Sequence, residues 1–127
     1  MINSQDVKNG LCIRMDGRLY FVVEFQHVKP GKGNTIMRVK MKDVVDGRVL
    51  ERRFNIGEKL EDVRVERRPY QFLYKEGEDY IFMNNETYEQ IQVTEDQVGD
   101  GKKYLKENMN VMILLHEGKV IGVDIPP

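Results

Sequence analysis

Residues 10–28 read GLCIRMDGRLYFVVEFQHV, in which apolar and polar side chains alternate on both sides of an Asp16-Gly17 pair. Alternation with a period of two is typical of strands that bury one face, and Asp-Gly readily adopts the positive φ angles of a type I′ hairpin turn. The pattern recurs in residues 35–56, TIMRVKMKDVVDGRVLERRFNI, around Asp46-Gly47. The first half of the chain is therefore predicted to form two β-hairpins that bend into a small β-barrel.

The second half predicts strands of the same kind with one interruption. We expect hairpins about residues 76–78 and at Glu117-Gly118, whereas residues 84–108 combine acids, glycines and weak helical spacing that favour one or two short helical turns between strands. Five strands with a helical insertion outline an OB-type barrel. No stretch rich in Gly and Ser separates the halves, so a boundary near residues 62–65 is expected to be short and stiff. The predicted fold class is all-β, with two small barrels in tandem.

The composition is that of a globular chain. Its 127 residues are 40% hydrophobic, and they contain no run of about 20 apolar residues, the length that a bilayer-spanning helix needs. The first ten residues, MINSQDVKNG, have neither the basic start nor the apolar stretch of a signal peptide, so we expect a cytoplasmic protein with no membrane partner. Cys12 has no second cysteine to pair with and lies between Leu11 and Ile13, where a small buried hydrophobe is the expected role.

Charge is divided unevenly along the chain. Residues 1–63 contain 12 Lys and Arg against 9 Asp and Glu, a net charge of +3, whereas residues 64–127 contain 8 against 12, a net charge of −4. A net charge of +3 is well below the excess typical of domains that bind nucleic acid through phosphates alone. Charge by itself therefore indicates ordinary solvated strand faces.

Residues 35–42 nevertheless predict a strand with one basic face. Arg38, Lys40 and Lys42 alternate with apolar residues, so the three cations share the side opposite the apolar one. This pattern supports one functional hypothesis, a generic two-barrel RNA-binding or assembly module that uses the basic strand face. Binding of that kind would depend strongly on salt.

A lysine loop, residues 28–35 with the sequence VKPGKGNT, joins the second and third strands. Pro30 fixes φ, and Gly31 and Gly33 leave Lys32 without neighbouring side chains, so a ligand or another backbone can come close to a single cation. A phosphate-binding P-loop would need Gly at position 26 and Ser or Thr at position 33, where the chain has Gln and Gly. The residues alone leave two interpretations open, a presented lysine or a hairpin tip that Lys and Gly keep soluble.

No constellation of reactive groups points to an enzyme. His27 and His116 lie in opposite halves without Cys or carboxylate partners at metal-binding spacing. Carboxylate pairs such as Glu61-Asp62 and Glu95-Asp96 are sequence neighbours beside turns, where solvation explains them. We therefore expect neither enzymatic activity, nor a metal, nor a cofactor.

Three segments give the chain a specific family resemblance. They are VKPGKGNTIMRVK at residues 28–40, RRPYQFLYKEGEDYIFMNNETYEQI at 67–91 and VIGVDIPP at 120–127, and through them the chain resembles bacterial translation elongation factor P over essentially its whole length. Two domains are also a feature of the archaeal and eukaryotic hypusine-bearing factor, but the FMNNETYEQ segment favours the bacterial family. The resemblance implies an SH3-like (KOW-type) barrel at residues 1–63, which carries the lysine loop, and an OB-fold domain at residues 64–127.

The resemblance also implies what the lysine loop does. Such factors bind the ribosome, both rRNA and ribosomal proteins, between the P and E sites and relieve stalling at consecutive prolines. The loop that faces the CCA end of the P-site peptidyl-tRNA falls on Lys29, Pro30, Gly31, Lys32, Gly33 and Asn34. The family's functional lysine falls on Lys32, and it is often extended covalently, commonly with β-lysine by an enzyme resembling lysyl-tRNA synthetase. Lys32 is thus the expected modification site.

Members of the family ordinarily continue into a third domain, a second OB-like barrel that recognises the elbow of the tRNA. That domain begins just after the segment that ends here at Pro126 and Pro127. On this resemblance we expect the chain to be a fragment of a longer factor.

Overall fold

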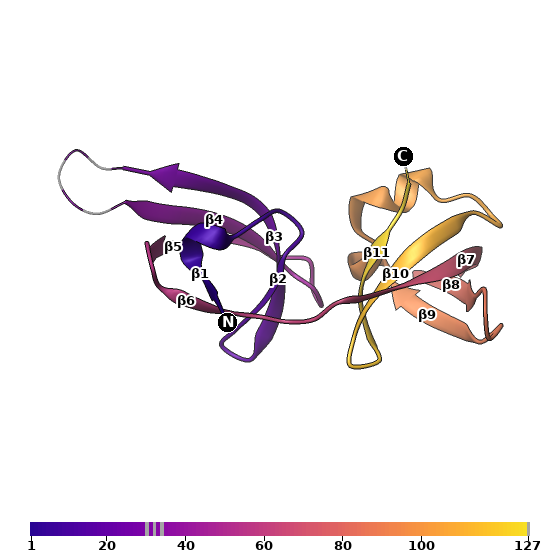
Figure 1. Cartoon of the computed structure of the whole chain (residues 1–127). Coiled ribbons are helices and arrows are strands. Elements are labelled where there is room, and N and C mark those ends of the chain that lie inside the picture. Colours follow the sequence, from indigo (N-terminus) through magenta and orange to yellow (C-terminus); the bar gives the residue numbers. More distant parts are fainter. Residues whose placement is uncertain (30, 32, 34, 127) are drawn as a thin grey trace. The chain divides into compact units, whose positions relative to one another are not determined.

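The computed structural model describes residues 1–29, 31, 33 and 35–126, and most of them lie in β-strands (Figure 1). The chain divides into two compact units, Met1–Arg64 and Val65–Pro127, and each unit has a sheet and a hydrophobic core of its own. The predicted all-β class is confirmed. Within the described ranges, no helix has the length and apolar character needed to cross a membrane.

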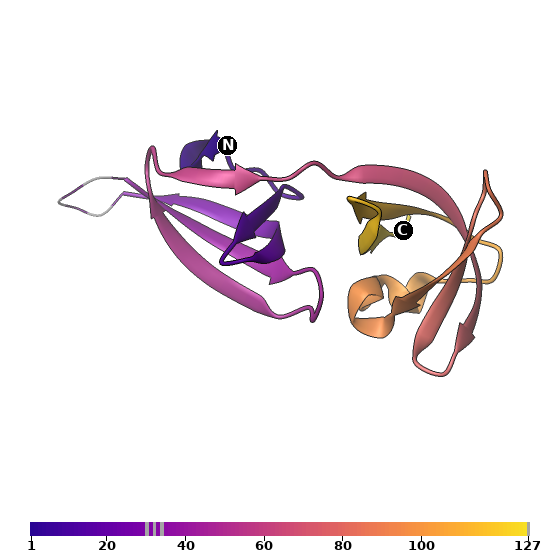
Figure 2. The ribbon, with the colours of Figure 1, turned by 90° about the horizontal axis from the view of Figure 1, so that it is seen from below.

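The first unit contains a six-stranded antiparallel sheet with the order β1-β6-β2-β3-β4-β5. Its elements are β1 (Ile2–Asn3), the 3-10 turn η1 (Ser4–Asp6), β2 (Cys12–Met15), β3 (Arg18–Val28), β4 (Ile36–Asp43), β5 (Val49–Asn55) and β6 (Lys59–Asp62). The two predicted hairpins are the β2–β3 and β4–β5 pairs and are confirmed. β3 and β4 form the longest ribbon of this sheet (Figures 1 and 2), and β5 pairs with β4 as far as Ile36.

The two predicted turns close in different ways. Asp16 and Gly17 have φ angles of 54° and 77°, as a type I′ turn requires at both positions. In the second hairpin β4 ends at Asp43, before the predicted Asp46-Gly47 turn. The difference arises because the Asp43 carboxylate accepts hydrogen bonds from the N–H groups of Val45 (2.8 Å) and Asp46 (3.3 Å), which curls the chain into a wider loop.

The core of the first unit follows the alternation of β4. Met37, Val39 and Met41 are fully buried, and Arg38 and Lys40 between them are exposed. This is the arrangement that a period of two predicts for a strand with one buried face. The remaining core side chains come from the other strands and the segment after η1, namely Val7, Ile13, Tyr20, Val22, Phe54 and Leu60.

A β-bulge in β3 changes which of its residues face this core. The register against β4 shifts between Val22 and Glu24, so Val23 is one extra residue. Strict alternation from Val22 would point Glu24 inward, whereas the bulge leaves Glu24 exposed and turns Phe25 onto the core. A bulge also bends its strand, which suits a sheet that must curve into a barrel.

The second unit contains a five-stranded antiparallel sheet with the order β11-β10-β7-β8-β9. Its elements are β7 (Glu66–Glu76), β8 (Asp79–Asn84), β9 (Gln90–Thr94), the helix α1 (Glu95–Val98), the 3-10 turn η2 (Gly99–Tyr104), β10 (Asn110–His116) and β11 (Lys119–Asp124). The predicted five strands and the helical insertion are confirmed, but residues 84–108, for which only helical turns were expected, also contain β9, so the insertion is confined to residues 95–104. Thr94 begins α1 with a capping box, and Val98 on this helix joins a core built around Phe72, Phe82 and Ile113.

Candidate functional site

The lysine loop continues the β3–β4 ribbon beyond its last paired residues. Val28 pairs with Ile36, and the exposed Lys29 follows β3 directly. Gly31 and Gly33 are exposed, and a Cβ atom on either would have no other atom within 4 Å. The φ angle of Gly33, +121°, lies in a region that favours glycine.

These observations place only part of the predicted loop. Lys29, Gly31 and Gly33 belong to an open, exposed end of the ribbon, as a presented loop requires. The other predicted members, Pro30, Lys32 and Asn34, lie outside the described residues. The role of Lys32 therefore stays a prediction.

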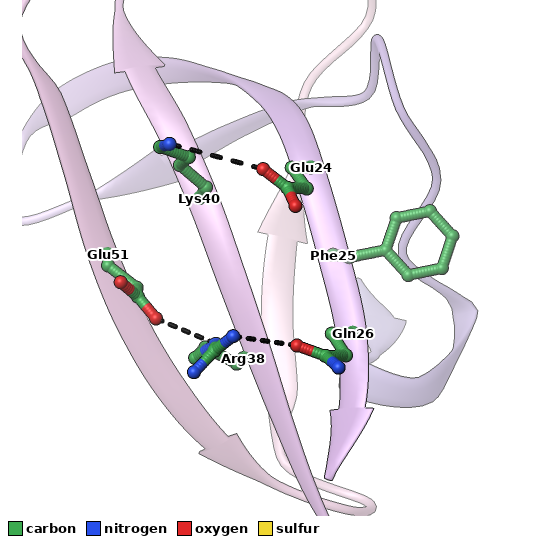
Figure 3. Close-up of a pocket in the computed structure, with 6 residues that line it drawn as sticks. All are labelled: Glu24, Phe25, Gln26, Arg38, Lys40 and Glu51. Carbon is green, nitrogen blue, oxygen red and sulfur yellow. Dashed lines mark hydrogen bonds and ion pairs between the residues drawn. The ribbon is translucent and has the colours of Figure 1, made fainter.

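The predicted basic face of β4 is arranged differently from the expectation. Arg38 and Lys40 are exposed on the outer face, but acidic side chains from both neighbouring strands reach them (Figure 3). Arg38 Nε lies 2.8 Å from Glu51 Oε1 on β5, and Arg38 Nη2 donates to Gln26 Oε1 on β3 at 2.7 Å. Lys40 Nζ lies 4.0 Å from Glu24 Oε2.

Together these side chains line a shallow hollow of about 170 Å³ on the outer face of β3, β4 and β5. Phe25 contributes to its wall, but its ring points away from the five polar side chains in Figure 3 and packs on the core. Because a carboxylate lies beside each of its two cations, Arg38 and Lys40, the hollow is a mixed-charge surface. A phosphate could reach Arg38 only in competition with Glu51.

Sequence reasoning missed three residues of this face. The register places Glu24 and Glu51 in one row with Lys40, and Arg53 directly opposite Arg38. Alternation in β3 and β5 marks these residues as polar, but their position beside β4 depends on the bulge and on the pairing register. The third predicted cation, Lys42, is half-buried in the next row.

The cysteine has no place in a reactive site. Cys12 is 1% exposed, and burial raises the pKa of its thiol to about 11, an effect that the nearby Arg14 charge only partly offsets. At neutral pH the thiol is therefore protonated and shielded from solvent. Within the described ranges, no three His, Cys, Asp or Glu side chains gather in a way that could hold a metal ion.

Comparisons with known proteins identify both units. A family model described as the elongation factor P (EF-P) KOW-like domain matches residues 3–60, and a model described as the elongation factor P (EF-P) OB domain matches residues 65–123. The predicted SH3-like (KOW-type) and OB folds are thus confirmed. The matches define the class of protein, a translation factor built from a KOW-like domain followed by an OB domain.

Relatives narrow this class to one family. The chain is 74% identical over 128 residues to elongation factor P of Bacteroides thetaiotaomicron and 56% identical over 126 residues to elongation factor P of Desulfitobacterium hafniense. Each alignment covers 99% of the chain and 68% of the relative, so the chain spans about two thirds of these proteins. The chain belongs to the elongation factor P family, which consists of translation elongation factors and not of enzymes.

A solved structure supports the fold. The structure titled "Eukaryotic translation initiation factor 5A from Methanococcus jannaschii" aligns with a TM-score of 0.67 at 24% identity, over 96% of this chain and 92% of that chain. This likeness confirms the two-barrel architecture.

Proposed function

We propose that the protein acts in the cytoplasm, binds the ribosome between the P and E sites and stimulates peptide-bond formation at polyproline stalls. Residues 1–63 form the barrel that carries the lysine loop in this proposal, and residues 64–127 form the OB-fold domain. Its partners are rRNA, ribosomal proteins and the P-site peptidyl-tRNA. The observation that carries the proposal is that a chain of this family holds the lysine loop at the end of its longest ribbon, β3–β4.

The proposed mechanism is positional. Proline is a poor and conformationally restricted substrate, so its reaction gains from anything that holds the tRNA end in attack geometry. A cationic arm at Lys32 would donate hydrogen bonds to phosphate and ribose oxygens of the CCA end. The factor assists the ribosome's own reaction, and the open space around Gly31 and Gly33 leaves room for RNA to approach the loop.

The proposal is tested with a reporter that encodes consecutive prolines. Lys32→Ala in the full-length gene product is expected to abolish relief of the stall, whereas Lys119→Ala, which removes an exposed lysine from the β10–β11 hairpin, is expected to leave it unchanged. Circular dichroism of both variants controls for folding. Normal relief by a folded Lys32→Ala variant would overturn the proposal.

We further propose that Lys32 is extended covalently by an enzyme resembling lysyl-tRNA synthetase, with β-lysine as one such group. An extension adds reach and hydrogen-bond donors to the arm. Intact mass of the protein from its native host, followed by peptide mapping over residues 29–38, tests this directly. A peptide in which Lys32 has only its ordinary mass would rule the extension out under those growth conditions.

The mixed-charge face supports a second candidate, RNA binding or assembly through Arg38, Lys40 and Lys42. Its cations are exposed, but Glu51 and Glu24 compete for two of them. Lys40→Glu discriminates between the candidates, because it adds an acidic group beside Glu24 and far along β4 from the loop. Loss of a salt-dependent RNA affinity in this variant, together with normal relief by Lys32→Ala, would favour the second candidate.

A further inference from the structure

The base of the lysine loop is bound to a turn on the neighbouring strand. The last row of the β3–β4–β5 sheet before the loop consists of Val28, Ile36 and Asn55. Just beyond this row, the N–H of Ile56 donates to the carbonyl of Thr35 at 3.3 Å. The β5–β6 turn therefore contacts the chain at Thr35, the residue between the loop and β4.

The N-terminal segment holds this turn from the other side. Ser4 is fully buried, and its hydroxyl donates to the carbonyl of Asn55 at 2.6 Å while its N–H donates to the carbonyl of Glu58 at 2.8 Å. The neighbouring Gln5 accepts a hydrogen bond from the N–H of Gly57 through Oε1 at 2.9 Å. Three hydrogen bonds from η1 thus fix a turn that contacts the base of the loop.

Burial of Ser4 is unusual for its residue type. Among the described residues, only two polar side chains are buried, Ser4 and Asp43. Asp43 is the last residue of β4, at the end far from the loop. Ser4 bonds to Asn55, which pairs with Ile36 at the loop end of β4. Each polar group is expensive to bury, and each is satisfied by hydrogen bonds: Asp43 bonds within the β4–β5 loop and to Arg18, whereas Ser4 bonds to the end of β5 and to the turn beside the loop base.

We propose that Ser4 is a positioning residue that aims the lysine loop through the β5–β6 turn. This inference rests on the proposed function of Lys32. The bulge bends the β3–β4 ribbon, and a Cβ atom on Gly31 or Gly33 beyond its end would meet nothing within 4 Å, so the direction of the loop depends on what fixes its base. Ser4, Gln5 and the turn of residues 56–58 supply that support from a segment distant in sequence.

The test compares Ser4→Ala with Asp43→Asn in the full-length gene product. Each variant weakens a buried polar contact of the same unit, but at opposite ends of β4. Pro–Pro bond formation is measured on purified ribosomes as a function of factor concentration. We expect Ser4→Ala to lower the maximal rate by about tenfold, a loss typical of a misplaced positioning group, and to leave the half-saturating concentration nearly unchanged. Asp43→Asn is expected to alter neither quantity at a temperature where it is folded.

A structural readout accompanies the kinetics. Hydrogen exchange at the Ile56 amide should be faster than wild type in Ser4→Ala and equal to wild type in Asp43→Asn, because only the first variant loosens the β5–β6 turn. Gln5→Ala removes an exposed contact to the same turn without emptying a buried site, and it should produce a smaller loss of the same kind. If Ser4→Ala does not fold, Gln5→Ala tests the positioning role in its place.

The outcomes separate this inference from the proposed function. Wild-type maximal rates for folded Ser4→Ala, or for Gln5→Ala where Ser4→Ala is unfolded, would overturn the positioning role. Equal losses in Ser4→Ala and Asp43→Asn would also overturn it, since general destabilisation would explain both. Full stimulation by Lys32→Ala would instead contradict the proposed function itself, whatever Ser4→Ala does.

Discussion

At the residue scale, Asp43 shows how a buried charge can stabilise a β-hairpin. Its carboxylate is 4% exposed and accepts hydrogen bonds from Arg18 Nε at 2.6 Å and from the N–H groups of Val45 and Asp46. Burial acts to raise the pKa of Asp43, but these hydrogen bonds outweigh burial, and the pKa lies below its ordinary value. The ionised form is therefore favoured in the folded state.

Asp43→Asn is expected to lower the free energy of unfolding at pH 7 by about 1–3 kcal/mol, the usual cost of disrupting buried hydrogen bonds to a charged group. A carboxyl with a lowered folded-state pKa contributes stability that is complete above its unfolded-state pKa and is lost as the pH falls through the folded value. The difference between variant and wild type should thus shrink below about pH 4. Urea denaturation from pH 7 to pH 2.5 measures it, and a difference that does not change with pH would contradict this assignment.

The charges around β4 show what the sequence could and could not predict for single residues. Alternation correctly placed Arg38 and Lys40 on an exposed face. It could not indicate that Glu51 and Glu24 lie beside them, because those partners come from other strands and depend on register. Ser4 carried no sequence signal at all, since its burial follows from the contact of η1 with the β5–β6 turn.

At the scale of the elements, hairpins with strong local signals were predictable. The Asp16-Gly17 and Glu117-Gly118 turns each combine a two-residue loop with positive φ at both positions. Short elements such as β1, with two residues, were not predictable because they have no pattern of their own and exist only by pairing with β6. The bulge at Val23 could not be predicted either, because it appears only in the pairing register of β3 with β4.

Gly17→Ala tests the turn geometry. Because Gly17 has a φ angle of 77°, an alanine there should destabilise the first unit by about 1 kcal/mol. Gly31→Ala is the matched control, since a Cβ at either glycine meets nothing within 4 Å but the φ angle of Gly31 lies outside the range from +20° to +160°; its effect should stay within about 0.5 kcal/mol. Thermal unfolding of both variants is the measurement, and equal effects would show that positive φ is not the cause.

At the scale of the whole molecule, the two units differ in charge and have separate cores. The net charge of +3 falls in the half that carries the lysine loop, and the net charge of −4 falls in the OB half. Ile113 and Met37 are both fully buried, one in each core. The tandem of two barrels was predictable from strand patterns, whereas the KOW-type assignment came from family resemblance.

Separate cores should respond separately to cavities. Ile113→Ala is expected to destabilise the second unit by about 2–5 kcal/mol, the usual cost of truncating a buried aliphatic side chain. Amide hydrogen exchange should accelerate in β7, β8 and β10 and stay at the wild-type rate in β2, β3 and β4. Met37→Ala should give the reverse pattern. Faster exchange in both units after either substitution would show that the chain unfolds as one cooperative unit.

We propose that Lys32 acts on the reaction from the end of a ribbon that the rest of the first unit supports. The most direct test is the rate constant of Pro–Pro bond formation on purified ribosomes at saturating concentrations of wild-type factor and of Lys32→Ala. We expect the variant to bind the ribosome but to give the rate seen without factor. A bound Lys32→Ala variant that stimulates the reaction as strongly as wild type would contradict it.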